Sequence, residues 1–244
     1  MDPFLKYVAL VEERIERRDR FPFSIPAIGG LGQLDLHPAV TFFVGENGSG
    51  KSTLLEAMAV VEGFNLEGGS RNYSFATHQE TSILSTAIRL GRGTKLLKQS
   101  DGFFLRGESL FNFATEAQRL GFSYGNKWLH DQSHGESFLT ILLNRFKPNG
   151  LYFLDEPESA LSPLRQLSFL RRMHDLVQQD CQLVIATHSP ILMAYPQSTC
   201  YWFSSKGIEP IDYRETDHFR ITKNCLEHTE RVLGELFAAD EVVE

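Results

Sequence analysis

The fold is decided by the stretch Gly45-Glu46-Asn47-Gly48-Ser49-Gly50-Lys51-Ser52, which fits the pattern G-x-x-x-x-G-K-[ST] at every required position. The apolar run Ala39–Val44 precedes it and is typical of a strand that is buried on both faces of a parallel sheet. A helix is expected to follow from Lys51 to about Glu62. Between a strand and a helix, glycines let backbone N–H groups point at phosphate oxygens, and the helix N-terminus adds the positive end of its dipole. The stretch therefore predicts a site for the phosphates of a nucleoside triphosphate.

Two side chains of this loop have defined expected roles. Lys51 can contact the β- and γ-phosphates as a point charge, and Ser52 can offer its hydroxyl to Mg²⁺. Thr53 is a weaker candidate for a phosphate contact. The predicted nucleotide-binding residues of the loop are Gly45, Glu46, Asn47, Gly48, Ser49, Gly50, Lys51, Ser52 and Thr53.

A second apolar run, Leu151–Leu154, ends in the acidic pair Asp155-Glu156. By itself, such a run is more often a strand that leaves the core, but the phosphate loop upstream favours a functional interpretation. Asp155, at the tip of a buried strand, is suited to bind Mg²⁺ directly or through water. Glu156 would then face the γ-phosphate as a general base for the attacking water. The pair therefore predicts hydrolysis rather than binding alone.

A third apolar run, Leu183–Ala186, leads to His188. A single histidine at a strand end is usually a structural or surface residue. Its place one helix and one strand after the acidic pair favours a role at the same site, where it could donate a hydrogen bond to the γ-phosphate or to the water. The predicted catalytic residues are therefore Glu156 and His188.

The alternation of strands and helices predicts an α/β fold with a mostly parallel sheet and flanking helices, in a single domain over residues 1–244. Residues from about 65 to 150 break this alternation and are expected to form an inserted helical lobe, which includes helical patterns around 81–90 and 109–120 and a short strand at Gly102–Arg106. Leu5, Val8, Val11 and Ile15 have helical spacing, so residues 5–18 are expected to form an amphipathic helix. An extended segment, Phe23–Ile25, is expected to follow it.

Composition excludes several classes of protein. The chain of 244 residues is 42% hydrophobic and 23% charged, which is ordinary for a globular protein and excludes a disordered or fibrous one. Its apolar runs are far shorter than the roughly 18 residues of a membrane span, and no apolar signal region follows Met1, so we expect a soluble, cytoplasmic protein without direct membrane insertion. Three cysteines without CxxC spacing predict reduced thiols.

The charge distribution limits the expected partners. A net charge of −7 argues against a surface that binds nucleic acid over its whole extent. A local basic stretch at 83–107 leaves a nucleic-acid contact open, although a solvated charged face is the simpler interpretation. Its basic residues are Arg89, Arg92, Lys95, Lys98 and Arg106.

Taken together, these motifs resemble the ATP-binding-cassette ATPases. The deciding stretch is Ser133-His134-Gly135-Glu136-Ser137, a variant of that family's Ser-Gly-Gly-Gln signature in which His134 replaces a glycine. Ser159–Ser162 resembles the loop that crosses the dimer interface in the family, and the segment Ala186–Pro190 is similar to that of the RecF, SMC and overcoming-lysogenisation-defect branch. Over about 21–194, the chain is most similar to the small stand-alone ATPases of that branch.

The resemblance implies ATP and Mg²⁺ as ligands and an ATP-dependent homodimer. In the family, two subunits pair head to tail, so that Ser133, Gly135 and Glu136 of one subunit would cap the ATP bound to the other. It also implies that Glu108, or less favourably Arg106 or Gln79, stands where the family has a glutamine, which makes Glu108 a third metal-ligand candidate beside Ser52 and Asp155. The aromatic residues upstream of the loop, Phe21 and Phe23, could stack on adenine, but burial in the core is favoured for both.

Three functions follow as expectations. The first is a Mg²⁺-dependent, ATP-hydrolysing switch in DNA metabolism, repair or phage defence, with a nucleic acid or an unidentified protein as a further partner. The second is the nucleotide-binding subunit of a membrane transporter, against which His134 and the segment Thr187–Pro190 argue. The third is a non-hydrolysing, ATP-gated interaction module, against which Glu156 argues, because a pure binder needs no base there.

Overall fold

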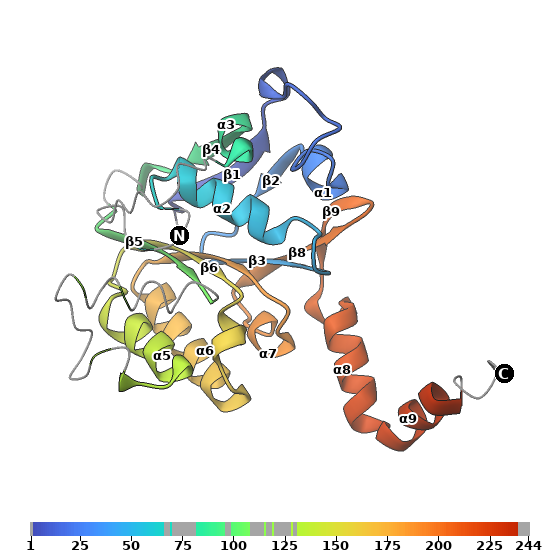
Figure 1. Cartoon of the computed structure of the whole chain (residues 1–244). Helices are drawn as coiled ribbons and strands as arrows, with labels where there is room; N and C mark the ends of the chain where they lie inside the picture. Colours follow the sequence, from blue (N-terminus) through green and yellow to red (C-terminus); the bar gives the residue numbers. More distant parts are fainter. Residues whose placement is uncertain are drawn as a thin grey trace.

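The computed structural model describes residues 2–65, 69, 82–95, 99–107, 115, 119, 128 and 131–238. In this part of the chain a six-stranded main sheet has the order β5-β6-β7-β3-β8-β9 (Figure 1). All neighbouring pairs of this sheet are parallel except β8 and β9, which are antiparallel. The strands are β3 (Val40–Gly45), β5 (Asp101–Arg106), β6 (Gly150–Asp155), β7 (Gln182–Ala186), β8 (Ser198–Ser204) and β9 (Gly207–Ile211). The predicted α/β fold with a mostly parallel sheet is confirmed.

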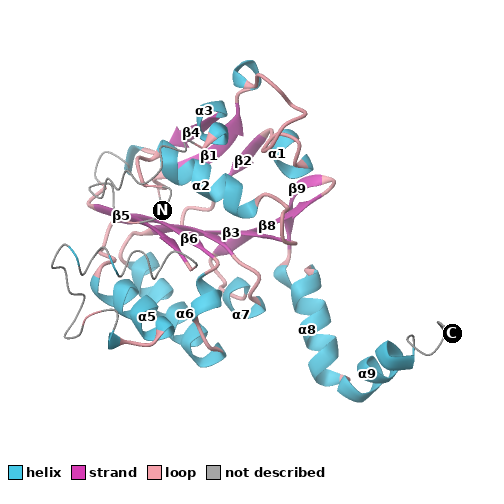
Figure 2. Ribbon diagram, viewed as in Figure 1, coloured by secondary structure: helices cyan, strands magenta, loops and turns pink. Residues whose placement is uncertain are grey.

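Helices cover both faces of the main sheet (Figure 2). On one face lie α2 (Lys51–Val61) and α3 (Ile83–Ala87), and on the other lie α5 (His134–Asn144), α6 (Pro163–Gln178) and α7 (Pro190–Met193). Successive strand residues point to opposite faces, so Phe43 packs in the cluster that contains Leu54 and Leu55 of α2, whereas Phe42 packs in the cluster of α5 and α6. Because both faces are covered, β3, β6 and β7 are buried throughout, which explains their uninterrupted apolar sequences.

A second, three-stranded sheet corrects the expectation for the N-terminus. Its order is β2-β1-β4, with β1 at Leu5–Leu10, β2 at Gln33–Asp35 and β4 at Ile88–Arg92. Residues 5–18 are therefore not a helix, since β1 is followed only by the short 3-10 helix η1 (Glu12–Arg14). The pairing of β1 with β4 shifts register between Leu5 and Tyr7, and this irregularity lets Leu5 and Val8 both be fully buried. Their three-residue spacing imitates a helical period.

Two further expectations change in the same way. Phe23–Ile25, expected to be extended, forms turns that lead into α1 (Pro26–Gly29). Within the range 65–150, expected as an inserted helical lobe, β4 belongs to the small sheet and β5 to the main sheet, and α5 packs into the core of the main sheet. The pattern at 109–120 lies outside the described residues apart from 115 and 119. The lobe over about 65–150 remains a proposal.

The C-terminal helices lie outside the two sheets and the helices that cover the main sheet. After β9 and the 3-10 helix η5 (Tyr213–Glu215), α8 (Asp217–Glu227) and α9 (Thr229–Ala238) extend away from the sheets (Figure 1). Neither helix contains a buried residue. Among the described residues, no helix combines the length and the apolar character needed to cross a bilayer.

The two sheets are joined by the side chain of Gln182, which begins β7 and is 1% exposed. Its Oε1 accepts a hydrogen bond from the N–H of Leu5 at 2.8 Å. Its Nε2 donates to the carbonyl oxygens of Leu5 at 2.8 Å and His37 at 3.0 Å. One amide therefore pairs three backbone groups of the N-terminal segment.

Replacement of this glutamine is expected to destabilise the protein strongly. In Gln182→Leu, three backbone groups lose their partner, and unpaired buried polar groups cost about 1–3 kcal/mol each. We expect the free energy of unfolding, measured by urea denaturation, to fall by about 3 kcal/mol or more. The matched control Gln33→Leu, at an exposed position of β2, should change it by about 0.5 kcal/mol or less. Equal effects of the two substitutions would contradict the joining role of Gln182.

Candidate nucleotide-binding site

The predicted phosphate loop lies between β3 and the N-terminus of α2. Gly50, which precedes α2, has φ of 100°, and a Cβ added there would lie 2.9 Å from the Ile28 side chain. A Cβ on Gly45 would lie 2.4 Å from the carbonyl oxygen of Phe203. Both positions therefore require glycine. Among the described residues no side chain caps the start of α2, so its first N–H groups remain available to an anion.

Lys51 is positioned at this loop by the backbone. Its Nζ donates to the carbonyl oxygens of Gly45 at 2.8 Å and Glu46 at 2.9 Å, and the residue is 4% exposed. Burial lowers the pKa of Lys51, while the carboxylates of Glu156 and Asp155 oppose this shift. The ammonium group is thus kept beside the loop, where phosphate oxygens would replace the carbonyl oxygens as acceptors.

The chain offers an oxygen-rich site for a divalent cation next to this lysine. The hydroxyl of Ser52 donates to Oδ1 of Asp155 at 2.8 Å, and Asp155 is 6% exposed at the end of β6. A hydroxyl and a carboxylate fit Mg²⁺, which prefers oxygen ligands and completes its shell with water and substrate phosphates. Among the described residues, no cluster of three or more acidic, histidine or cysteine side chains could hold a metal ion. Glu108, the third candidate ligand, lies outside the described residues.

Arg106, the less favoured alternative at the position of the family's glutamine, lies at the same edge. It ends β5, and the parallel register places it opposite Asp155. Its Nε is 3.7 Å from Oδ2 of Asp155, and its Nη1 is 2.8 Å from the Glu56 carboxylate on α2. A cation at this place balances the charge of Asp155 and does not act as a metal ligand.

The two predicted catalytic residues lie together at the neighbouring strand ends. The Glu156 backbone has φ of 47° and ψ of 54°, and its N–H donates to the carbonyl oxygen of Ala186 at 2.9 Å. Oε1 of Glu156 is 3.4 Å from Nε2 of His188. Burial lowers the pKa of His188, and the charges of Lys51 and His218 add to this shift. The parallel order β6-β7-β3 therefore places Asp155, Glu156, His188 and the phosphate loop at one edge of the sheet.

Two residues of this site were missed by the sequence analysis. His218, near the start of α8, has its Nε2 2.8 Å from Nδ1 of His188, and no sequence pattern marks it. Glu158 accepts a hydrogen bond from the His188 N–H at 2.5 Å, and its Oε2 is buried without a hydrogen-bond partner among the described residues. Its position in the acidic run Asp155–Glu158 was the one signal that could have identified it.

The burial of Glu158 predicts that the stability of the protein depends on pH. Burial raises the pKa of Glu158; hydrogen bonds from the His188 N–H and the Thr187 side chain oppose this, and the charge of Glu156 adds to it. A carboxyl with a higher pKa in the folded chain binds more protons when folded. The contribution of the Glu158 carboxyl to the free energy of unfolding is therefore full below about pH 4.5, its pKa in the unfolded chain. This contribution is lost as the pH rises through the pKa of the same carboxyl in the folded chain.

We expect Glu158→Gln to remove this dependence. Between about pH 5 and about pH 8, the variant should gain on the order of 1 kcal/mol of unfolding free energy relative to the wild type. Urea denaturation at the two pH values measures the difference. The control Glu209→Gln, at an exposed position of β9, should retain the wild-type dependence. If Glu158→Gln also retains it, the buried carboxyl does not carry the effect.

The predicted signature residues lie on the other face of the main sheet, at the start of α5 (Figure 2). Ser133 caps this helix and forms a capping box with Glu136, whose carboxylate accepts from the Ser133 hydroxyl at 2.8 Å and from its N–H at 2.9 Å. Arg165 of α6 contacts both, at 3.1 Å from Ser133 Oγ and 3.2 Å from the Glu136 carboxylate. A Cβ on Gly135 would lie 2.5 Å from the carbonyl oxygen of Ala160, so glycine is needed for this packing. The signature is thus on the opposite face from α2 of the same chain.

The two aromatic candidates for adenine stacking differ in how far their side chains are exposed. Phe23 is 7% exposed and packs with Ala27 and Ile28 in the core, as favoured from the sequence. Phe21 is 65% exposed, which differs from the burial expected for it. Of the two, only Phe21 has a ring that remains accessible to a base.

Three of the five basic residues in the stretch at 83–107 have acidic partners. Arg92 pairs with Glu62 at 3.0 Å and Lys95 with Asp180 at 3.0 Å, in addition to the contacts of Arg106. Lys98 lies outside the described residues. Paired cations of this kind are typical of an ordinary charged surface rather than of a phosphate-backbone contact.

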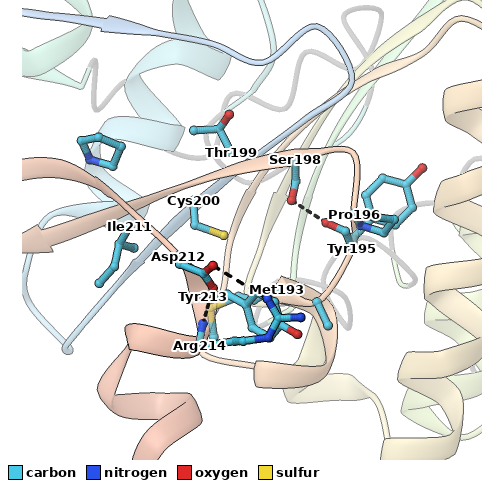
Figure 3. Close-up of a pocket in the computed structure, with 12 residues that line it drawn as sticks. Met193, Tyr195, Pro196, Ser198, Thr199, Cys200, Ile211, Asp212, Tyr213 and Arg214 are labelled. Carbon is cyan, nitrogen blue, oxygen red and sulfur yellow. Dashed lines mark hydrogen bonds and ion pairs between the residues drawn. The ribbon is translucent and has the colours of Figure 1, made fainter.

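A cavity of about 530 Å³ lies between α7 and the strands β8 and β9 (Figure 3). Its lining includes Tyr195, Cys200, Asp212 and Arg214, but no residue of the phosphate loop. Burial raises the pKa of Cys200 to about 12, so its thiol is not reactive at neutral pH. All three cysteines are free, as expected.

The loop between β3 and α2, in a parallel sheet of this order, defines the protein as a P-loop NTPase. Residues 40–139 and 137–194 match the family described as "AAA domain, putative AbiEii toxin, Type IV TA system". These ranges cover more than half of the chain, so the protein belongs to this family of P-loop ATPase domains. The resemblance stated from the motifs is thereby confirmed for the family and the fold.

The chain is similar, at low sequence identity, to an ABC transporter and to solved ATPase structures. The chain is 26% identical over 176 residues to the ABC transporter G family member STR2 of Medicago truncatula, which is 62% of this chain and 24% of that protein. It therefore spans about a quarter of the length of this curated relative. The structure of cbiO1 from Clostridium perfringens, part of the ABC transporter complex cbiONQ, matches 98% of this chain and 100% of its own, with 17% identity and a TM-score of 0.52. The SMC head domain from Thermotoga maritima matches 85% of this chain and 98% of its own, with 18% identity and a TM-score of 0.48.

Proposed function

We propose that the protein is a Mg²⁺-dependent ATP hydrolase that acts as a nucleotide-driven switch in the cytoplasm. The observation that carries this proposal is the grouping of Lys51, Ser52 with Asp155, and Glu156 with His188 at one edge of the main sheet. A nucleotide binder that does not hydrolyse ATP needs the first two groups but has no use for a carboxylate and a histidine beside the γ-phosphate position.

In this proposal each residue has a defined task. Lys51 exchanges its loop carbonyl acceptors for oxygens of the β- and γ-phosphates. Ser52 and Asp155 hold Mg²⁺, which neutralises charge on the phosphates when bound. Glu156 takes a proton from the attacking water, and the Nε2–H of His188 donates a hydrogen bond to the γ-phosphate. Nε2 of His188 is buried and has no hydrogen-bond partner among the described residues, which fits a group that binds a substrate oxygen.

We further propose that two chains pair head to tail around two ATP molecules. The exposed Ser133 lies at a helix N-terminus on the face opposite to α2 of its own chain, so it can serve the phosphate loop of a second chain. The loop Ser159–Ser162 would lie at this interface. Since Ser133 and Glu136 are held by each other and by Arg165, the capping group is preorganised before ATP binds.

The biological setting of this switch is proposed as defence or DNA metabolism. The family's description refers to a toxin of a toxin–antitoxin system, which supports a role in defence against phage. The acidic partners of Arg92, Lys95 and Arg106 argue against a nucleic-acid contact through the stretch at 83–107. The match to part of a plant ABC transporter favours one alternative, the nucleotide-binding subunit of a transporter.

Hydrolysis by the wild-type protein tests the proposal directly. Release of phosphate from ATP should require Mg²⁺ and stop when EDTA removes it, because Ser52 and Asp155 alone leave the phosphate charges unbalanced. GTP, DNA and RNA are compared in the same assay, and the mass of the protein is measured with and without ATP. Tight ATP binding with no Mg²⁺-dependent turnover would instead support the non-hydrolysing module.

A further inference from the structure

The first turn of α8 lies against His188. Thr216, which is 1% exposed, caps the helix by accepting a hydrogen bond from the Phe219 N–H at 3.3 Å, and the rings of Phe219 and Tyr213 meet edge to face at 5.4 Å. These contacts fix the place of His218, whose ring centroid is 5.8 Å from that of Trp202 in a T-shaped contact. Its Nε2 lies 2.8 Å from Nδ1 of His188. This distance between two ring nitrogens requires a hydrogen bond in which one nitrogen carries the proton and the other accepts.

The surroundings of His188 decide which nitrogen donates. Nε2 of His188 lies 3.4 Å from a Glu156 carboxylate oxygen, which attracts an N–H and repels a nitrogen lone pair. Burial lowers the pKa of His188, so the neutral ring carries one proton, and that proton belongs on Nε2. Nδ1 of His188 is then the acceptor, and Nε2 of His218 is the donor.

The environment of the other ring nitrogen of His218, Nδ1, independently leads to the same assignment of donor and acceptor. Its Nδ1 is buried and has no hydrogen-bond partner among the described residues. Burial also lowers the pKa of His218, so this ring is neutral as well. A proton on Nδ1 would be a buried donor without an acceptor, which costs more than an unused lone pair at a nitrogen. The proton of His218 therefore belongs on Nε2, directed at His188.

We propose that His218 is a positioning residue for His188. By donating its Nε2–H to Nδ1 of His188, it holds the Nε2–H of His188 toward Glu156 and the γ-phosphate position, and it links α8 to the nucleotide site. The catalytic consequence rests on the proposed function, whereas the hydrogen bond itself does not.

The hydrogen bond is tested by ¹⁵N NMR of histidine-labelled protein, with His188→Gln used to assign the His188 signals. We expect the wild type to show His188 protonated on Nε2 with Nδ1 as a hydrogen-bonded acceptor. In His218→Leu, the Nδ1 signal should move to that of a nitrogen without a donor. A wild-type His188 protonated on Nδ1, or a Nδ1 signal unchanged in His218→Leu, would overturn the proposal whether or not the protein hydrolyses ATP.

The catalytic consequence is tested by two substitutions of His218, of which only one retains a hydrogen-bond donor. His218→Leu should lower kcat about 10- to 100-fold with KM for ATP changed by about twofold or less, because positioning acts in the transition state. His218→Gln places an amide N–H near the position of the imidazole Nε2 and should restore most of kcat. The control His228→Leu, at the exposed end of the same helix, should match the wild type. Equal losses in His218→Leu and His218→Gln, or none in His218→Leu, would contradict the positioning role.

Discussion

Glu156→Gln is expected to abolish ATP hydrolysis while ATP binding is retained. Glutamine has the size of the native side chain and can still accept a hydrogen bond, but it cannot take a proton from water. Loss of a general base lowers rates by about 10²- to 10⁴-fold. The backbone should be unaffected, since the N–H of residue 156 keeps its bond to the Ala186 carbonyl oxygen. Phosphate release and binding of ATP are measured on the same preparation.

The same substitution also tests the dimer. If hydrolysis opens a head-to-tail dimer, a chain that binds ATP without hydrolysing it should accumulate as a dimer in ATP and remain monomeric without it. Sedimentation in each condition distinguishes the two. The matched control Glu209→Gln, on the exposed side of β9, should hydrolyse ATP at the wild-type rate. Wild-type turnover in Glu156→Gln would place the base elsewhere and refute the catalytic assignment.

Lys51→Ala is expected to weaken ATP binding by about 100-fold or more, which corresponds to about 3 kcal/mol. The substitution removes the buried ammonium group that faces the phosphate position, and no other described lysine is bonded to the loop carbonyls. Lys51→Arg should not restore binding, because a planar guanidinium does not reproduce a compact ammonium in a buried site. Titration with a non-hydrolysable ATP analogue measures the affinity.

Loss of the two bonds from Lys51 to the loop could also loosen the loop itself, so the stability of each variant is measured alongside binding. A midpoint of urea denaturation close to that of the wild type, together with weak binding, identifies a lost phosphate contact. The control Lys206→Ala, in the exposed turn between β8 and β9, should bind the analogue normally. Wild-type affinity in Lys51→Ala would contradict the assignment of the loop.

Much of the fold could be predicted because its central strands are buried on both faces. β3, β6 and β7 appear in the sequence as apolar runs, and α2 was expected at the right place because the loop motif marks its start. β1 could not be predicted in this way. Its register shift places Leu5 and Val8 on the same buried side, so its spacing matches a helix better than a strand.

The residues of the candidate site were likewise predictable only where a local sequence pattern marks them. Lys51, Ser52, Asp155, Glu156 and His188 follow directly from strand ends and from a contiguous loop, and the structure brings them to one edge. His218 could not be found, because its contact with His188 joins residues 30 apart through the packing of α8 and not through any local pattern. Glu108 and the neighbouring residues of the expected lobe lie outside the described part of the chain.

Local sequence encodes the phosphate loop, the acidic strand end and the parallel character of the main sheet, because each depends on residues that are adjacent in the chain. By contrast, the contact of Gln182 with Leu5 across 177 residues and the 2.8 Å approach of His218 to His188 are visible only in the folded chain. The same holds for Arg106, which meets Asp155 only because β5 lies beside β6. The physical reason is that a hydrogen bond between distant residues depends on strand order and helix packing, which no local spacing encodes.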